Sequence, residues 1–185
     1  MIAIMLAPHV AQLIALSDRS ITLRNGDRLF GAGQVVRFLF VVREGGVQML
    51  RRHAGGAALI LQRASRNEIV AEASVFSSRY HCEAIGEGPT SLARIPKEAV
   101  LQLQTEDPRW LQHFAAHLAS EVQRARARAE LLALKKVGER VDAWLALHEG
   151  DMPSRGRRVD WANELGVTPE ALYRELAKRR VMGPL

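Results

Sequence analysis

Cysteine is nearly absent from this chain of 185 residues, since Cys82 is its only one. A single thiol excludes an intramolecular disulfide and a zinc site built from cysteines, and it is consistent with a reducing cytoplasm. Long apolar runs are lacking as well: no stretch of about 18 apolar residues occurs, so we expect no membrane span. The apolar segment Met1–Leu16 has no basic region before it, and we expect it to form a short amphipathic helix.

The residue patterns of common enzyme classes are also missing. The chain has no Ser-His-Asp order, no set of metal ligands and no glycine loop of the Walker type. His113 and His117 stand four residues apart on a predicted helix, but no glutamate partner motif accompanies them. His81 and Cys82 are adjacent on a predicted strand, so they would point to opposite faces and would not readily share a metal. We therefore expect no enzyme activity, no metal and no cofactor.

Basic charge is what the chain has in excess. Its 26 lysines and arginines outnumber its 20 acidic residues, which gives a formal charge of +6 and a pI of about 10.2. This balance admits nucleic acid as a partner without proving it. A hydrophobic content of 48% is typical of a soluble globular protein.

Short runs with alternating apolar residues follow Asp18 and are separated by segments rich in glycine. The predicted strands are Ile21–Leu23, Val36–Val42, Val47–Leu50, Ala57–Leu61, Cys82–Ile85 and Ser91–Ile95. Because glycine permits positive φ, tight turns are predicted at Asn25–Asp27, Gly31–Gly33, Glu44–Gly46 and Ala54–Gly56. Strands at this spacing indicate a sandwich or a rolled-up barrel.

A long helical pattern, Pro108–Leu147, carries a continuous apolar seam. The seam residues recur at alternating steps of four and three, as in a pairing helix: Leu111, Ala115, Leu118, Val122, Ala125, Ala129 and Leu132. Asp107 is placed to cap the helix, and Gly138 is a candidate for a break in it. Because the small alanines let two helices approach closely, we expect a homodimer interface here. A core helix of a monomer is the alternative.

The most specific pattern lies near the end of the chain. Ala162 is small where two helices would cross, Gly166 permits a turn, and Leu172 is placed to pack the second helix on the first. Thr168 suits the N-cap of this second helix, and Pro169 suits its first position. These features predict a helix-turn-helix, with a helical hairpin used only for packing as the alternative.

Three segments of the first half can be compared with a known family of proteins: Gly26–Gly33, Phe40–Val47 and Glu68–Phe76. They resemble the cyclic-nucleotide-binding β-roll and phosphate-binding cassette of the cyclic AMP receptor protein (CRP/FNR) family of bacterial regulators. The helix-turn-helix segment resembles the same family. The resemblance implies an α+β fold with an N-terminal β-roll, a long dimerisation helix and a C-terminal helix-turn-helix.

In that family a glutamate of the cassette holds the nucleotide, and Glu72 stands at its position. An arginine and a small hydroxyl residue should follow, but this sequence has Arg79 and the bulky Tyr80 there. The residues implied for an effector pocket are Glu72, Ser74, Arg79 and Tyr80. Because the cassette departs from the family pattern, we expect an unknown small-molecule effector, or none, rather than cyclic AMP.

The second helix of the family's helix-turn-helix enters the major groove of DNA. The resemblance implies that Glu170 and Arg174 read base edges, while Pro169 replaces a further arginine. The residues expected at DNA are Thr168, Glu170, Tyr173, Arg174, Lys178, Arg157 and Arg158. A β-hairpin wing should follow, but the sequence has only Val181–Leu185, so we expect an incomplete wing. The phosphate contacts of a wing are expected to come instead from arginines elsewhere: Arg155, Arg157, Arg158, Arg179 and Arg180.

The predicted domains are a β-roll effector-type domain at 1–107, the dimerisation helix at 108–136 and the DNA-binding domain at 137–185. They indicate a cytoplasmic transcription regulator that binds double-stranded DNA as a homodimer at a palindromic site. RNA polymerase is a further partner that the resemblance implies. The alternative is a β-roll sensor or protein-interaction module that has lost tight DNA binding, which Pro169 and the incomplete wing favour.

Overall fold

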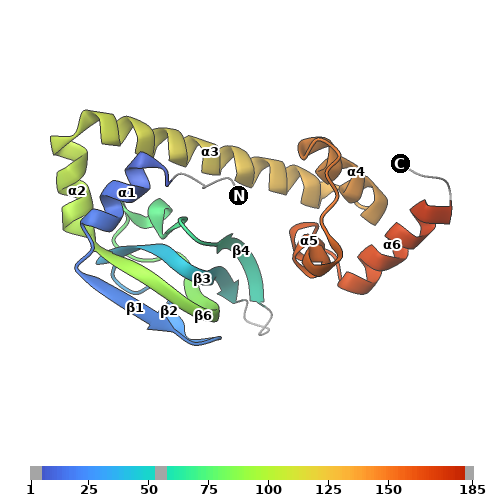
Figure 1. The fold of residues 1–185 in the computed structure, drawn as a ribbon, viewed down its shortest axis with the longest axis horizontal. Helices are drawn as coiled ribbons and strands as arrows, with labels where there is room; N and C mark the ends of the chain where they lie inside the picture. Colours follow the sequence, from blue (N-terminus) through green and yellow to red (C-terminus); the bar gives the residue numbers. More distant parts are fainter. Residues whose placement is uncertain (1–5, 53–57, 182–185) are drawn as a thin grey trace. The chain divides into compact units, whose positions relative to one another are not determined.

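The computed structural model describes residues 6–52 and 58–181, which form two compact units, Met1–Leu118 and Ala119–Leu185 (Figure 1). Unit 1 begins with helix α1 (Pro8–Ala15) and contains a six-stranded antiparallel sheet. Its strands are β1 (Arg19–Leu23), β2 (Arg28–Phe30), β3 (Phe38–Arg52), β4 (Ala58–Ala64), β5 (Ile69–Val70) and β6 (Glu83–Pro96). A 3-10 turn, η1 (Glu72–Ser74), follows β5, and helix α2 (Lys97–Glu106), which the sequence did not predict, follows β6.

The long strands β3 and β6 form the centre of the sheet and pair from Phe38↔Pro96 to Leu50↔Glu83. The sequence predicted two shorter strands in place of each, with a turn at Glu44–Gly46, and this prediction is wrong. Gly45 has φ +75°, but it lies within a paired region, where a Cβ would overlap the carbonyl oxygen of Pro89. Glycine is needed at this position because β6 approaches the backbone closely, not because the chain reverses.

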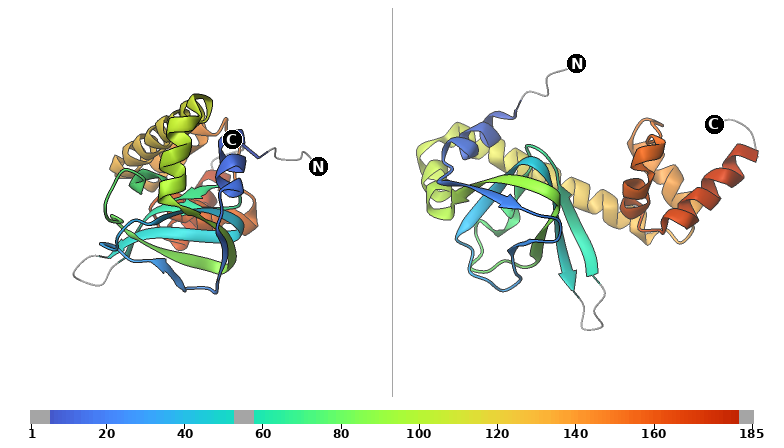
Figure 2. Two further views of the ribbon diagram at one scale, coloured as in Figure 1. Left: turned by 90° about the vertical axis from the view of Figure 1, so that its left-hand side faces the viewer. Right: turned by 60° about the horizontal axis from the view of Figure 1, so that its bottom comes forward.

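The two faces of the sheet bury separate cores. The inner core contains Phe30, Phe40, Val42, Tyr80 and Leu92 among others. The opposite face is covered by helices, with Leu13, Val41, Ile95, Trp110 and Phe114 among the buried residues. Figures 1 and 2 show α1, α2 and the start of α3 (Pro108–Ala133) gathered on that face. The alternation along each strand explains the two cores, since neighbouring residues point to opposite faces.

Helix α3 begins where the sequence predicted, because the Asp107 carboxylate accepts hydrogen bonds from the backbone N–H groups of Arg109 and Trp110 at 3.0 and 2.9 Å. The helical pattern does not run unbroken to Leu147. Helix α3 ends at Ala133, and α4 (Val137–Leu147) starts after an extended Lys136. The break thus precedes the predicted position, Gly138, which lies inside α4.

In unit 2, α4, α5 (Arg158–Glu164) and α6 (Pro169–Val181) pack around one core with Leu131 of α3, and the short turn η2 (Arg155–Arg157) precedes α5. The predicted helix-turn-helix is confirmed: Ala162 and Leu172 are fully buried, and Gly166 takes φ +63° in the turn. The prediction of an incomplete wing concerns Val181–Leu185, of which residues 182–185 lie outside the described residues. No helix in the described part of the chain has the length and apolar character that crossing a bilayer requires.

Candidate DNA-binding surface and effector cavity

Helix α6 has one buried face and one exposed polar face. Leu172 and Leu176 point into the core of unit 2. The exposed side chains away from that core lie three or four residues from Glu170 or Arg174, as neighbours on one side of a helix do: Glu170, Tyr173, Arg174 and Lys178. Four of the seven residues predicted to lie at DNA therefore share this surface, which we call the α6 face.

The start of α6 is held by a capping interaction that the sequence predicted. Thr168 Oγ1 accepts a hydrogen bond from the backbone N–H of Ala171 at 3.2 Å. Hydrogen bonds from its own backbone N–H and from Thr168 lower the pKa of Glu170 below its ordinary value. Glu170 is thus ionised at neutral pH and presents only acceptor atoms, as recognition of a cytosine amino group demands.

The arginines near the α6 face differ in their availability. Arg157 is exposed on η2. The guanidinium of Arg158 is half-buried and lies 6.0 Å from the ring centroid of Tyr173, a weak cation–π contact that ties α5 to α6. Arg179 donates to Asp142, Glu175 and the carbonyl oxygen of Gly138 at 2.6, 3.0 and 2.9 Å. Arg179 therefore joins α6 to α4 and is poorly placed to replace a phosphate contact of the wing.

Arg140 is a positioning residue that the sequence analysis missed. Its guanidinium donates to the carbonyl oxygens of Leu134, Leu165, Gly166 and Leu132 at 2.9, 2.9, 3.0 and 3.2 Å. These acceptors belong to the end of α3 and to the turn between α5 and α6. One side chain thus fixes the turn that orients α6, and no local sequence pattern could have indicated it.

The cassette segment of unit 1 borders a cavity of about 70 Å³. Glu72 and Ser74 line it, together with residues that the sequence did not single out for the pocket, among them Gln62, His81 and Cys82. The Gln62 amide donates to the Glu72 carboxylate at 3.3 Å, and Ser74 Oγ lies 3.4 Å from His81 Nδ1. Burial raises the pKa of the Cys82 thiol, which keeps it in the neutral form. The side chains of Gln62 and Ser74 thus already have polar partners within this cavity.

The other two predicted pocket residues do not line this cavity. Arg79 is exposed and donates to the carbonyl oxygen of Gly33 at 2.6 Å. Tyr80 is buried in the inner core, where its ring stacks on Phe30 with centroids 3.9 Å apart and its hydroxyl donates to the Phe38 carbonyl at 2.6 Å. Both residues are used to hold the β-roll together.

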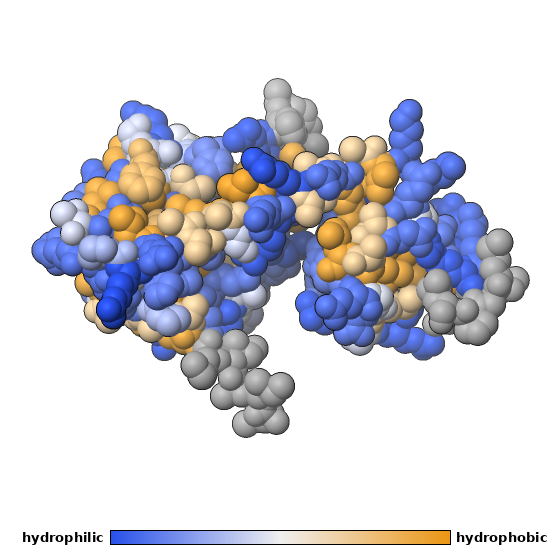
Figure 3. Space-filling view, turned by 90° about the horizontal axis from the view of Figure 1, so that it is seen from above, coloured by the Kyte–Doolittle hydropathy of each residue, from blue (hydrophilic) through white to orange (hydrophobic). Residues whose placement is uncertain are grey.

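The predicted seam of α3 is mostly uncovered. Leu111, Val122 and Leu132 are 40%, 49% and 36% exposed, although leucine and valine usually lie inside. Ala115, Ala125 and Ala129 are exposed as well, and Leu118 is half-buried. Figure 3 shows hydrophobic residues reaching the surface in the view from above α3. Within the described residues, no group of three or more His, Cys, Asp or Glu residues is placed to hold a metal ion.

In chain order, the structure thus has a β-roll with a cassette segment, a long helix and a helix-turn-helix. Residues 20–107 match the family model of the cyclic nucleotide-binding domain. These residues thus resemble the cyclic nucleotide-binding domain, and the fold of the chain is that of the CRP/FNR regulators, as the sequence predicted.

Solved structures support the same fold along the chain. FixK2 from Bradyrhizobium japonicum matches with TM-score 0.71 and 19% identity over 89% of this chain and 85% of its own. The c-di-GMP responsive global regulator CLP of Xanthomonas campestris matches with TM-score 0.68 and 22% identity over 95% and 92%. The catabolite activator protein of Thermus thermophilus matches with TM-score 0.58 and 24% identity over 98% of this chain and 89% of its own. A search of curated protein sequences found no match.

Proposed function

We propose that the protein is a cytoplasmic transcription regulator that binds double-stranded DNA through the α6 face. The single observation that carries this proposal is the exposed set of Glu170, Arg174 and Lys178 on one side of a capped helix. Arg174 has the fork that bonds guanine, Glu170 can accept from cytosine, and Lys178 can neutralise a phosphate. The resemblance to DNA-binding regulators and the formal charge of +6 support the same function.

The test is selection of bound duplexes from a random pool, followed by affinity measurements at several salt concentrations. Arg174→Ala should cost about 1–3 kcal/mol at one base pair and relax the preference there. Arg157→Ala should weaken binding to all sequences similarly and reduce the salt slope by about one. Arg19→Ala, an exposed arginine of unit 1, is the matched control and should change neither property. Equal loss of base preference in Arg174→Ala and Arg157→Ala would refute these roles.

We further propose that the chain forms a homodimer through the α3 seam. An uncovered apolar row along a helix is stabilised when a second copy buries it, and small alanines permit close packing. Two α6 faces in a dimer would read half-sites about 34 Å apart, which predicts a palindromic operator. In sedimentation, Val122→Glu should shift the protein to monomer, while Gln123→Glu, which adds the same charge beside the seam, should leave the dimer intact. A wild-type monomer at high micromolar concentration would contradict the proposal.

Cyclic AMP is not the effector in our proposal. Sites for small ligands typically measure about 300–1000 Å³, far more than the 70 Å³ cavity beside the cassette. Glu72 also already accepts a hydrogen bond from Gln62. Calorimetric titration with cyclic AMP should therefore give no saturable heat, and submillimolar binding would overturn this inference.

A sensor or interaction module without tight DNA binding is the second candidate function. The observation that favours it is the engagement of Arg179 by Asp142 and Glu175, which removes one donor from the phosphate contacts. If selection recovers no symmetric site above non-specific binding while the protein is dimeric, this candidate replaces the first. If a symmetric site is recovered, a pull-down with RNA polymerase tests the remaining predicted partner.

A further inference from the structure

A second, larger cavity of about 450 Å³ lies on the helix-covered face of the sheet in unit 1. Ile14 of α1 borders it on one side, and beyond the apolar Ala93 the face of the sheet becomes polar. The register explains this, because Ser20 pairs with Ala93, and Ser91 pairs with Glu44. The cavity therefore begins where α1 stops covering the sheet, and it is separate from the cassette cavity.

A β-bulge places two adjacent charged residues at this cavity. The pairing of β3 with β6 shifts between Val42 and Glu44, so Arg43 is the extra residue opposite Ser91. Consecutive strand residues normally point to opposite faces, but a bulge redirects one of them. As a result, Arg43 and Glu44 both line the same cavity.

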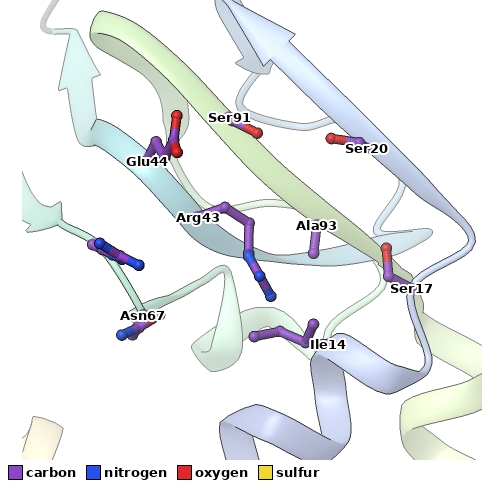
Figure 4. A pocket seen from close by; sticks show the side chains of 9 residues that line it. Ile14, Ser17, Ser20, Arg43, Glu44, Asn67, Ser91 and Ala93 are labelled. Carbon is purple, nitrogen blue, oxygen red and sulfur yellow. The ribbon is translucent and has the colours of Figure 1, made fainter. Parts of the chain in front are cut away.

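A second arginine comes from the turn between β4 and β5, where Arg66 and Asn67 line the cavity. This turn is fixed by its own contacts: the Glu68 carboxylate accepts from the Ser65 backbone N–H at 2.7 Å, and the Asn67 N–H donates to the Val42 carbonyl at 2.8 Å. In the view of Figure 4, Arg43 lies between Asn67 on one side and the serines on the other. The cavity thus has ordered walls on both sides.

The charges of the cavity are not used by the protein. Among the described residues, none forms a hydrogen bond or an ion pair with the guanidinium of Arg43 or Arg66. The other polar groups at the cavity include three serines and the Asn67 amide. Two free guanidinium forks with nearby hydroxyl groups are the donors that bind a phosphate, and the Glu44 carboxylate can accept from a hydroxyl group of the same ligand.

We propose that this cavity binds a small organic phosphate that also carries hydroxyl groups. The phosphate group is held by Arg43 and Arg66, and the hydroxyl groups donate to Glu44. The volume of 450 Å³ suits a ligand of the size of a sugar phosphate or a mononucleotide. This site is independent of the proposed DNA-binding function, because it uses no residue of the α6 face.

The experiment is calorimetric titration of the full chain with ribose 5-phosphate, ribose and inorganic phosphate. Ribose 5-phosphate should bind saturably, inorganic phosphate more weakly and ribose not at all. Arg43→Gln and Arg66→Gln should each weaken ribose 5-phosphate binding about tenfold or more, because each removes a charge-assisted pair. Glu44→Gln should weaken binding of ribose 5-phosphate but not of inorganic phosphate.

Arg37→Gln is the matched control, since it removes the same charge from an exposed residue of unit 1 that does not line the cavity. It should change the affinity by less than about twofold. The side chains of the substituted arginines form no hydrogen bond or ion pair with a described residue, so the thermal unfolding of all three variants should match the wild type. Absence of saturable binding at millimolar ribose 5-phosphate would overturn the proposal. So would equal affinities of the Arg43, Arg66 and Arg37 variants.

Discussion

Replacement of Arg140 by alanine should destabilise unit 2 more than any loss of an exposed arginine. The substitution removes the hydrogen bonds to the carbonyl oxygens of Leu132, Leu134, Leu165 and Gly166. Two of these bonds are partly buried, and the carbonyl groups lose their donor when the guanidinium is removed. The α5–α6 turn would then lose its main link to the end of α3.

The magnitude follows from the burial of these bonds. A hydrogen bond that involves a charged group contributes about 1.5–3 kcal/mol when well shielded and less in contact with water. We count about 1–1.5 kcal/mol for each of the two partly buried bonds and nearly nothing for the exposed ones, because water replaces them. The free energy of unfolding of unit 2 should therefore fall by about 2–3 kcal/mol. For a domain of this size, this corresponds to a decrease in Tm of about 8–24 °C.

Thermal unfolding followed by tryptophan fluorescence is the assay, since Trp144 and Trp161 lie in the core of unit 2. Arg140→Lys keeps the charge but lacks the fork that reaches several carbonyl groups, so it should recover little of the loss. Arg126→Ala, an exposed arginine of α3, should stay within about 0.5 kcal/mol of wild type. A wild-type Tm in Arg140→Ala, or full recovery in Arg140→Lys, would refute the reasoning.

Two further predictions concern the turn and a helix cap. Gly166→Ala should lower the free energy of unfolding by about 2–4 kcal/mol in urea unfolding, because residue 166 has φ +63° and the new Cβ would overlap the Leu132 side chain. Gly150→Ala is the control: Gly150 has φ +83° but open space around it, so the loss should be only about 1 kcal/mol. Asp107→Ala should lower Tm by a few degrees at neutral pH, because it removes the cap of α3. Hydrogen bonds from the Trp110 backbone N–H and then from the Gln12 side chain lower the pKa of Asp107 in the folded protein. The ionised Asp107 therefore stabilises the folded state fully above its ordinary pKa of 3.8, and this stabilisation is lost as the pH falls through the lower folded-state pKa. The Tm difference between wild type and this variant should therefore shrink in strong acid; a constant difference from pH 7 to pH 2 would contradict this account.

The helix-turn-helix was predictable because its signals are local. Ala162, Gly166 and Leu172 occupy positions set by helix geometry alone, and Thr168 caps the helix that directly follows it. The long strands were harder, because their continuity depends on pairing between distant segments. Glycines at 45 and 46 favour a turn locally, but the pairing of β3 with β6 continues on both sides of them and the chain does not reverse.

The residues of the candidate sites also fall into those that the local sequence indicates and those that depend on distant contacts. The α6 face could be predicted, since residues three or four apart on a helix share a face. The roles of Arg79 and Tyr80 could not, because the Gly33 and Phe38 carbonyl groups that accept from them are supplied by distant residues. Arg140 and the bulge at Arg43 gave no sequence signal for the same reason.

The two cavities of unit 1 show why the outer one is the better place for a ligand. A polar group contributes to binding only when its interaction with the ligand is more favourable than the interaction that it loses. A group that must break a hydrogen bond within the protein loses the free energy of that bond. In the cassette cavity, the Glu72 carboxylate already accepts a hydrogen bond from Gln62, and the cavity holds only about 70 Å³. At the outer cavity, no described residue forms a hydrogen bond with the guanidinium of Arg43 or Arg66, so a phosphate there would displace none of those bonds. A phosphate should therefore gain more at the outer surface of the β-roll than beside its cassette.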